Sequence, residues 1–159
     1  MNRPPRQSGL VMLALLLALL LSAVLMMQAA ETWVTTLKRE REAELLFVGA
    51  QYRLAIRRYY LGAPSGQPRR FPAQLEDLLE DTRYPVPVQH LRRLYADPIT
   101  GTADWGLVRS GDRIAGVYSQ SQDKPLKQTG FEPANVAFEG RDAYKEWVFM
   151  FVPPPVRRR

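Results

Sequence analysis

The chain has 159 residues, which allows one modest domain beyond any membrane segment, because domains usually contain about 100–150 residues. Its formal net charge is +6, but five of its 22 basic residues lie near the two ends, and the remaining 17 face 16 acidic residues, so the charge gives no reason to expect a nucleic-acid-binding surface. The absence of cysteine excludes a disulfide framework, a thiol nucleophile and a thiolate metal site.

An apolar run follows the first residues, with the sequence RQSGLVMLALLLALLLSAVLMMQAAE beginning at Arg6. From Leu10 to Met27 only Ser22 is not plainly apolar. The run approaches the roughly 20 residues that cross a bilayer and exceeds the core of a signal peptide, which spans about 7–15 residues. Secretory cleavage requires a small residue three positions before the cut, but a cut after Ala30 would place Gln28 there and a cut after Ala29 would place Met27 there. We therefore predict a retained transmembrane helix over residues 10–30.

The apolar run leads without a break into an amphipathic segment. No proline occurs between Pro5 and Pro64. Apolar residues recur at steps of three and four, which places them on one face of a helix; they are Val34, Leu37, Leu45, Val48, Tyr52, Ala55, Ile56 and Tyr59. We predict a continuous helix from about residue 10 to residue 61, ended by the turn sequence GAPSGQP, in which residues 31–61 form an amphipathic continuation.

Three features of the sequence bear on the stability and surroundings of this predicted helix. Gly49 is expected to weaken it, because glycine costs about 1 kcal/mol relative to alanine inside a helix. Trp33 lies just past the apolar run, where aromatic residues mark a membrane interface. The mixed charges of KRERE at residues 38–42 predict a solvated helix face.

The remaining residues predict a small α+β head over 62–152. FPAQLEDLLEDTRYP is typical of a short helix that begins near Pro72, and VQHLRRLY at 88–95 predicts a second helical segment. Strands are predicted at WGLVRS, RIAGVYSQS and EWVFMFV, with a turn at Gly111 between the first two. Residues 153–159 predict a flexible basic tail. The predicted fold class is therefore α+β, with a long N-terminal transmembrane-plus-stalk helix packed against a small antiparallel sheet.

Residues that often carry chemistry are few. The single histidine, His90, has no carboxylate or serine at a suitable local spacing, which favours a structural or exposed role. Four acidic residues fit either paired catalytic carboxylates or an early helical turn, where negative charge complements the helix dipole, and we favour the second; they are Glu76, Asp77, Glu80 and Asp81.

Four further aspartates lie in predicted loops, where calcium finds oxygen ligands. Their spacing matches no EF-hand, and turn formation explains them; they are Asp97, Asp104, Asp112 and Asp123. Neither a G-x-S-x-G sequence nor a glycine-rich phosphate loop occurs. We therefore predict no catalytic, cofactor-binding or metal-binding residue and do not expect an enzyme.

A polar leader that ends in glycine, an apolar helix that becomes a stalk, and a small α+β head together resemble the type IV pilins and the type II secretion pseudopilins. In the head, LYADPITGTADWGLV and IAGVYSQSQDKPLKQTGF resemble the Asp-Pro turn, short strands and Tyr-Ser loop of major pseudopilins. The resemblance implies that a prepilin peptidase removes the leader, residues 1–9, by cutting after Gly9. It also implies that the amino group of Leu10 is then methylated.

The chain departs from this family at two positions. Leu10 stands where the mature family members usually begin with phenylalanine. Ala14 occupies the fifth mature position, which is usually a glutamate that pairs with the amino terminus of a neighbouring subunit. A carboxylate in lipid is costly unless it is paired, so its absence removes a docking contact. These departures favour a minor or divergent subunit, and the family's calcium loop does not match SQSQDKPLKQTGF.

The resemblance implies a non-catalytic structural subunit of a type II secretion pseudopilus or a type IV pilus-like filament, which contributes to protein secretion. The expected location is the bacterial inner membrane, crossed once, with the head in the periplasm. The expected partners are other pilin or pseudopilin subunits, prepilin peptidase, secretion platform proteins and membrane lipid, without nucleic acid. The alternative is an unprocessed single-pass inner-membrane protein whose periplasmic head binds a partner or ligand. An enzyme on an anchor is the third possibility.

Overall fold

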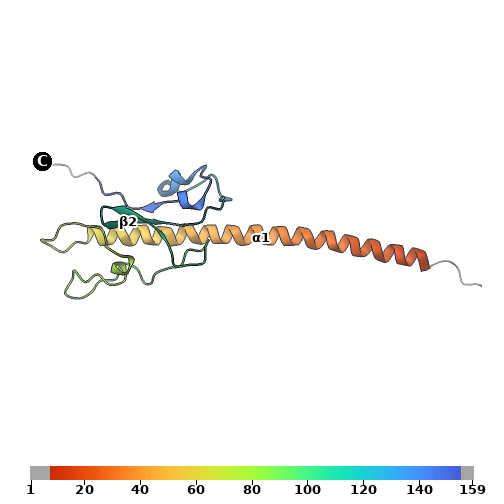
Figure 1. The fold of residues 1–159 in the computed structure, drawn as a ribbon, viewed down its shortest axis with the longest axis horizontal. Coiled ribbons are helices and arrows are strands. Elements are labelled where there is room, and N and C mark those ends of the chain that lie inside the picture. The colour runs from red at the N-terminus through yellow and green to blue at the C-terminus, as the bar shows by residue number, and fades with distance from the viewer. Residues whose placement is uncertain (1–7, 155–159) are drawn as a thin grey trace, which may run out of the picture. The chain divides into compact units, whose positions relative to one another are not determined.

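The computed structural model describes the backbone of residues 8–154, with the side chains at 8, 24, 25 and 27–32 outside the description. Residues 1–7 of the predicted leader and 155–159 of the predicted tail therefore lie outside the described part. The fold is α+β (Figure 1), and its elements in chain order are α1 Ser8–Leu61, η1 Leu75–Leu78, β1 Gly106–Ser110, β2 Arg113–Tyr118, η2 Pro133–Phe138, η3 Tyr144–Glu146 and β3 Phe149–Met150. The three η elements are short 3₁₀-helices.

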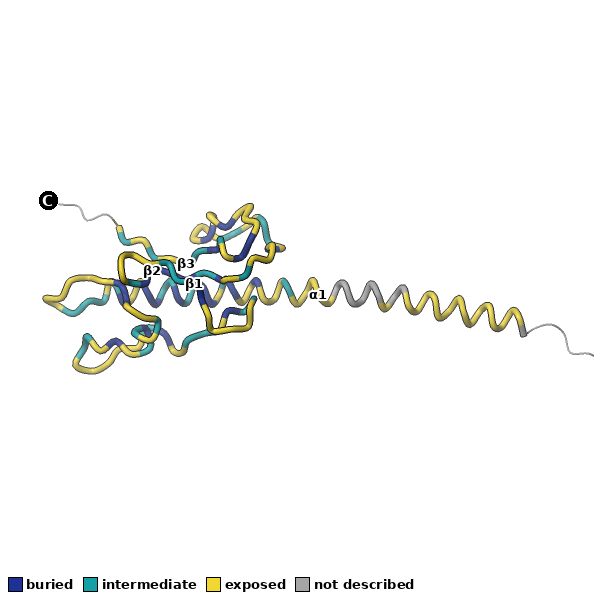
Figure 2. The backbone as a smooth tube through the Cα atoms, viewed as in Figure 1, coloured by how far each residue is buried: buried dark blue, intermediate teal, exposed yellow. Residues whose placement is uncertain are grey.

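The helix α1 contains 54 residues and ends at Leu61, where the sequence predicted its end. The chain divides into two compact units, Met1–Lys38 and Arg39–Arg159. In the first unit, every residue from 9 to 23 is exposed, as the colours of Figure 2 show.

The prediction that residues 10–30 form a membrane-spanning helix is wrong, although these residues are helical. Crossing a bilayer requires about 20 consecutive apolar residues. Among the described residues, no helix is both long and apolar enough to do so. The fold is therefore corrected from a transmembrane-plus-stalk helix with a sheet to a long α-helix with a three-stranded antiparallel sheet.

The sheet has the order β1-β2-β3, and each strand pairs with its neighbour in an antiparallel manner. β1 and β2 form a hairpin whose turn contains Gly111 at a φ of 66°, a conformation that glycine adopts without strain. The pairing shifts between Val108 and Arg109. All three predicted strands are present, but the third is limited to Phe149 and Met150.

The core forms between the second half of α1 and the sheet with its connecting segments. Six of the eight residues of the predicted stripe are buried; they are Leu45, Val48, Tyr52, Ala55, Ile56 and Tyr59. The other two, Val34 and Leu37, are 65% and 38% exposed, so the buried face begins later than the periodicity predicted. Because β2 is buried at four consecutive positions, both of its faces are covered.

Of the two short helices predicted in the head, the first is limited to one turn and the second is absent. Of residues 71–85, only Leu75–Leu78 are helical, as a single 3₁₀ turn. Residues 88–95 contain no helix, because their backbone bonds to the preceding segment instead. Asp81 N–H donates to the Val88 carbonyl at 2.9 Å, and the N–H groups of His90 and Leu91 both donate to the Leu78 carbonyl.

Candidate functional site

The exposed apolar surface of α1, residues 9–23, is the first candidate site, because it contains the predicted cleavage and docking positions. Gly9 and Leu10 lie in the first turn of α1, and Ala14 follows one turn later. Apart from its chain neighbours and the helix backbone, no atom of the described residues lies within 4 Å of a Cβ built on Gly9. Leu10 is 74% exposed.

This surface carries no polar group that is free to bind a ligand. Ser22 is its only polar residue, and its Oγ donates to the Ala18 carbonyl of the same helix at 2.8 Å. Large aliphatic side chains that are more than half exposed surround the helix axis; they include Leu13, Leu15, Leu16, Leu17, Leu19, Leu20 and Leu21. A helix that is apolar on all sides is normally buried against other apolar groups. The arrangement suits helix packing and offers no group for catalysis.

No family model, curated protein or solved structure matches this chain. The resemblance to pilins and pseudopilins therefore remains a prediction from the sequence.

A buried ionic cluster lies where the head meets the end of α1. The carboxylate of Asp81 accepts hydrogen bonds from Arg83 at 2.6 and 2.8 Å, and lies 3.0 Å from Nε2 of His90. The Asp81 side chain is fully buried. Burial raises its pKa, but the hydrogen bonds from Arg83 and His90 outweigh burial and lower the pKa to about 2.

This cluster corrects two interpretations of the sequence. His90 does have a carboxylate partner, which the local spacing did not reveal because the two residues meet across a chain reversal. Asp81 does not act on a helix dipole, because it lies beyond the end of η1. Arg83 also donates to the Tyr59 carbonyl at 2.7 Å and stacks over the Tyr59 ring at 3.6 Å. The cluster therefore ties this segment to α1 and needs no catalytic explanation.

Asp97 forms the predicted turn, but from a buried position. Its carboxylate accepts hydrogen bonds from the Ile99 N–H at 2.9 Å and from Ser119 Oγ at 2.6 Å. Its backbone closes the loop through Gly101 and Thr102. Asp97 thus links the turn to the end of β2, and its bonds are structural.

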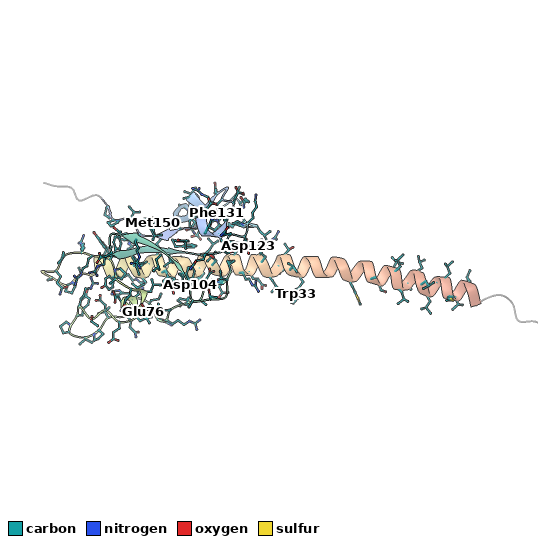
Figure 3. All side chains as sticks on the ribbon, viewed as in Figure 1. Trp33, Glu76, Asp104, Asp123, Phe131 and Met150 are labelled. Atoms are coloured by element: carbon teal, nitrogen blue, oxygen red, sulfur yellow. The ribbon has the colours of Figure 1, made fainter. Side chains whose placement is uncertain are left out.

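The other acidic residues considered in the sequence are dispersed. Asp77 caps its own turn by accepting from the Ala73 N–H at 2.8 Å. Five others are exposed; they are Glu76, Glu80, Asp104, Asp112 and Asp123. Figure 3 labels three of them, Glu76, Asp104 and Asp123, at separate places on the head. Within the described residues, no group of three or more His, Cys, Asp or Glu side chains is placed to hold a metal ion.

Glu42 is a functional candidate that the sequence analysis missed. It belongs to KRERE, which predicted a solvated face, but it is only 3% exposed. Its carboxylate accepts hydrogen bonds from the Tyr144 hydroxyl at 2.9 Å and from the backbone N–H groups of Leu126 and Lys127. Burial and this contact with Glu42 raise the pKa of Tyr144. The only signal in the sequence is that Glu42 precedes Leu45 by three positions, on the same side of the helix.

Proposed function

We propose that this protein is a non-catalytic structural subunit of a filament of the type II secretion pseudopilus or type IV pilus kind, in a minor or divergent role. The proposal rests on the difference between the two parts of α1. Residues 9–23 expose apolar side chains on all sides, whereas residues 42–59 supply one wall of the head's core. A helix of this kind connects a folded head to an apolar assembly surface.

The apolar part of α1 is covered in the filament by the corresponding helices of other subunits. Burying apolar surface gains about 25 cal/mol per Å², and branched aliphatic side chains pack closely between helices. Exposed leucines such as Leu13, Leu17 and Leu20 supply this area. Ala14 supplies no carboxylate to pair with a neighbour's amino terminus, so the docking of this subunit depends on packing alone.

Processing prepares this surface for assembly. Prepilin peptidase cuts after Gly9, and the new amino terminus at Leu10 is methylated. The exposure of Gly9 supports this step, because, apart from its chain neighbours and the helix backbone, none of the described residues has an atom within 4 Å of a Cβ built there. Removal of the leader, with its Arg3 and Arg6, leaves a chain that begins directly with apolar residues.

The mass of the purified amino-terminal peptide tests the proposal. In cells with an active prepilin peptidase, we expect a peptide that begins at Leu10 and carries one additional methyl group. A Gly9→Leu variant should keep the full leader, whereas a control Ser8→Ala variant should be processed. A wild-type chain that still begins at Met1 in the presence of the active peptidase would contradict the proposed function.

A further inference from the structure

A groove runs along one face of α1 within the second unit of the chain. Three cavities of about 400, 330 and 350 Å³ line up on this face. The first and second share Ala43, Leu46 and Lys127, and the second and third share Ala50. The cavities therefore follow one another along the same face of α1, and we refer to this row of cavities as the groove.

The floor of the groove has the spacing of a helix-docking surface. Each helical residue of the lining has another lining residue three or four positions away, which places the set on one face of α1; the set is Arg39, Glu42, Ala43, Leu46, Phe47, Ala50, Arg53, Leu54, Arg57 and Leu61. Phe47 is 59% exposed although it is aromatic. Ala43 and Ala50 lie seven positions apart, and their small side chains permit the close approach of another helix.

The opposite wall comes from the segment after β2 and from the end of the chain. Leu126, Lys127 and Phe131 border the first two cavities, and Phe151 borders the third. Figure 3 shows Phe131 and Met150 on one side of α1 and Glu76 on the other. This wall is fixed in place, because Glu42 binds the backbone of Leu126 and Lys127.

The charge of the groove is positive. Arg39 and Arg57 lie toward its two ends and are exposed, and no hydrogen bond or ion pair of either is found among the described residues. Lys127 lies with its ammonium group over the Phe131 ring at 5.1 Å. Arg53 is held by Ala134 and Asn135. Against these, Glu132 is the one acidic residue of the lining that is not already bound to backbone and hydroxyl groups.

These charges decide which occupant fits. If the same faces of two copies paired, a parallel arrangement would place Arg39 against Arg39, and an antiparallel arrangement would place it near Arg57. Like charges in contact disfavour both arrangements. An acidic partner is favoured instead. The two arginines are separated by about 27 Å along the helix, at 1.5 Å per residue.

We propose that this groove binds an amphipathic helix of a partner protein, with an apolar face over Ala43, Phe47 and Ala50 and acidic residues that meet Arg39 and Arg57. Helix-in-groove recognition uses such anchors at i, i+3, i+4 and i+7. The site goes beyond the filament role and does not depend on it, because every residue of the groove lies after Lys38, outside the apolar part of α1.

Binding of a synthetic helical peptide to the full chain tests this proposal. The probe is a fluorescently labelled peptide of about 20 residues, with leucine and alanine on one face and glutamates about 18 positions apart. The matched control peptide carries lysines in place of the glutamates. We expect the acidic peptide to bind at least tenfold more tightly, with an affinity that falls as salt is raised.

Variants of the chain locate the contact. R39E/R57E should weaken binding of the acidic peptide at least tenfold, whereas Arg58→Glu, exposed on the same helix but outside the groove, should change it less than twofold. Ala50→Trp should block binding by filling the shared floor, and its fold is checked by circular dichroism.

Three outcomes would overturn the proposal. The first is no binding of the acidic peptide at millimolar concentration and low salt. The second is equal binding of both peptides, or an Arg58→Glu effect as large as that of R39E/R57E. The third is an Ala50→Trp variant that changes only the self-association of the chain in sedimentation, which would assign the groove to a second copy. The mass of the mature amino terminus is unaffected by these results, so this test is separate from that of the filament role.

Discussion

Gly49 of α1 lies against the Phe149 ring of β3. A Cβ at this position would lie 2.4 Å from ring carbons of Phe149, which is fully buried. We expect Gly49→Ala to lower the free energy of unfolding by about 1–3 kcal/mol through overpacking. The gain in helix propensity offsets about 1 kcal/mol of this cost, which leaves a net loss of up to about 2 kcal/mol. Urea denaturation measures the difference.

A second variant separates packing from propensity at this position. The smaller side chain of Phe149→Leu makes room for a methyl group, so the double variant should lose less stability than the sum of the two single variants. If Gly49→Ala alone stabilised the protein, glycine would be a weak point of the helix, as the sequence predicted, rather than a contact position.

Glu42 joins α1 to the segment after β2 through one buried carboxylate. Glu42→Ala leaves the Tyr144 hydroxyl and two backbone N–H groups without this acceptor. A buried polar group that loses its partner costs about 1–3 kcal/mol, and we expect a loss of at least this size. The exposed Glu44 serves as the control, because Glu44→Ala should change stability by less than about 0.5 kcal/mol. Equal losses in the two variants would contradict the anchoring role.

Asp81 makes the stability of the head depend on pH. Its pKa in the folded chain is lowered to about 2, below the value of about 3.9 in an unfolded chain. A depressed pKa stabilises the fold above the unfolded value, and this contribution disappears as pH falls through the folded value. We therefore expect a loss of about 2 kcal/mol between pH 5 and pH 2, measured from urea midpoints. In Asp81→Asn, this part of the pH dependence should be absent, and an unchanged profile would exclude Asp81 as its source.

At the scale of elements, the long helix was predictable and the short ones were not. The end of α1 at Leu61 follows from an unbroken pattern and a clear turn sequence. The segment from residue 71 to residue 95 has leucines at helical spacing, but its N–H groups bond to distant carbonyls. The Asp81–Val88 bridge and the two N–H bonds to Leu78 compete with helical bonds. Such bonds join residues about ten positions apart, which no local pattern reveals.

Contacts between residues far apart in the chain also limited the prediction of the candidate sites. The apolar surface of α1 could be found from composition, because it is a property of consecutive residues. The bonds of Glu42 could not, because Tyr144 lies 102 positions away in the chain. The pair of His90 and Asp81 spans only nine positions, yet it forms only because the backbone reverses between them.

Ala14 of α1 allows the docking of this helix into a filament to be tested. If the proposed filament role holds, Ala14 lies exposed on the assembly surface without the carboxylate that pairs with a neighbour's amino terminus. Ala14→Glu should therefore increase crosslinking of this chain to filament subunits. Ala14→Gln is the matched control, because it has similar size without charge and should not increase crosslinking. Equal crosslinking of the two variants would contradict the prediction that a carboxylate at this position strengthens docking.

At the scale of the whole molecule, the boundary between the two units falls inside α1 rather than at its end. Among the residues whose burial is described, the buried apolar ones all lie at or after Leu45, and six of these belong to α1. The head therefore includes the second half of the helix. A chain that starts at Gly62 lacks these six residues and leaves Phe149 without the helix surface at Gly49.

Truncation tests where the folding unit begins. We expect a chain that starts at Arg39 to unfold cooperatively, with a urea midpoint close to that of the full chain, because it keeps every core residue and the Glu42 anchor. A chain that starts at Gly62 should show no cooperative transition, since it lacks Ala55 and five large core side chains. Burying each large side chain contributes about 1.5–3 kcal/mol, so their loss is as large as the whole stability of a small domain. Cooperative unfolding of the shorter chain would mean that the sheet and its connecting segments form a core without α1.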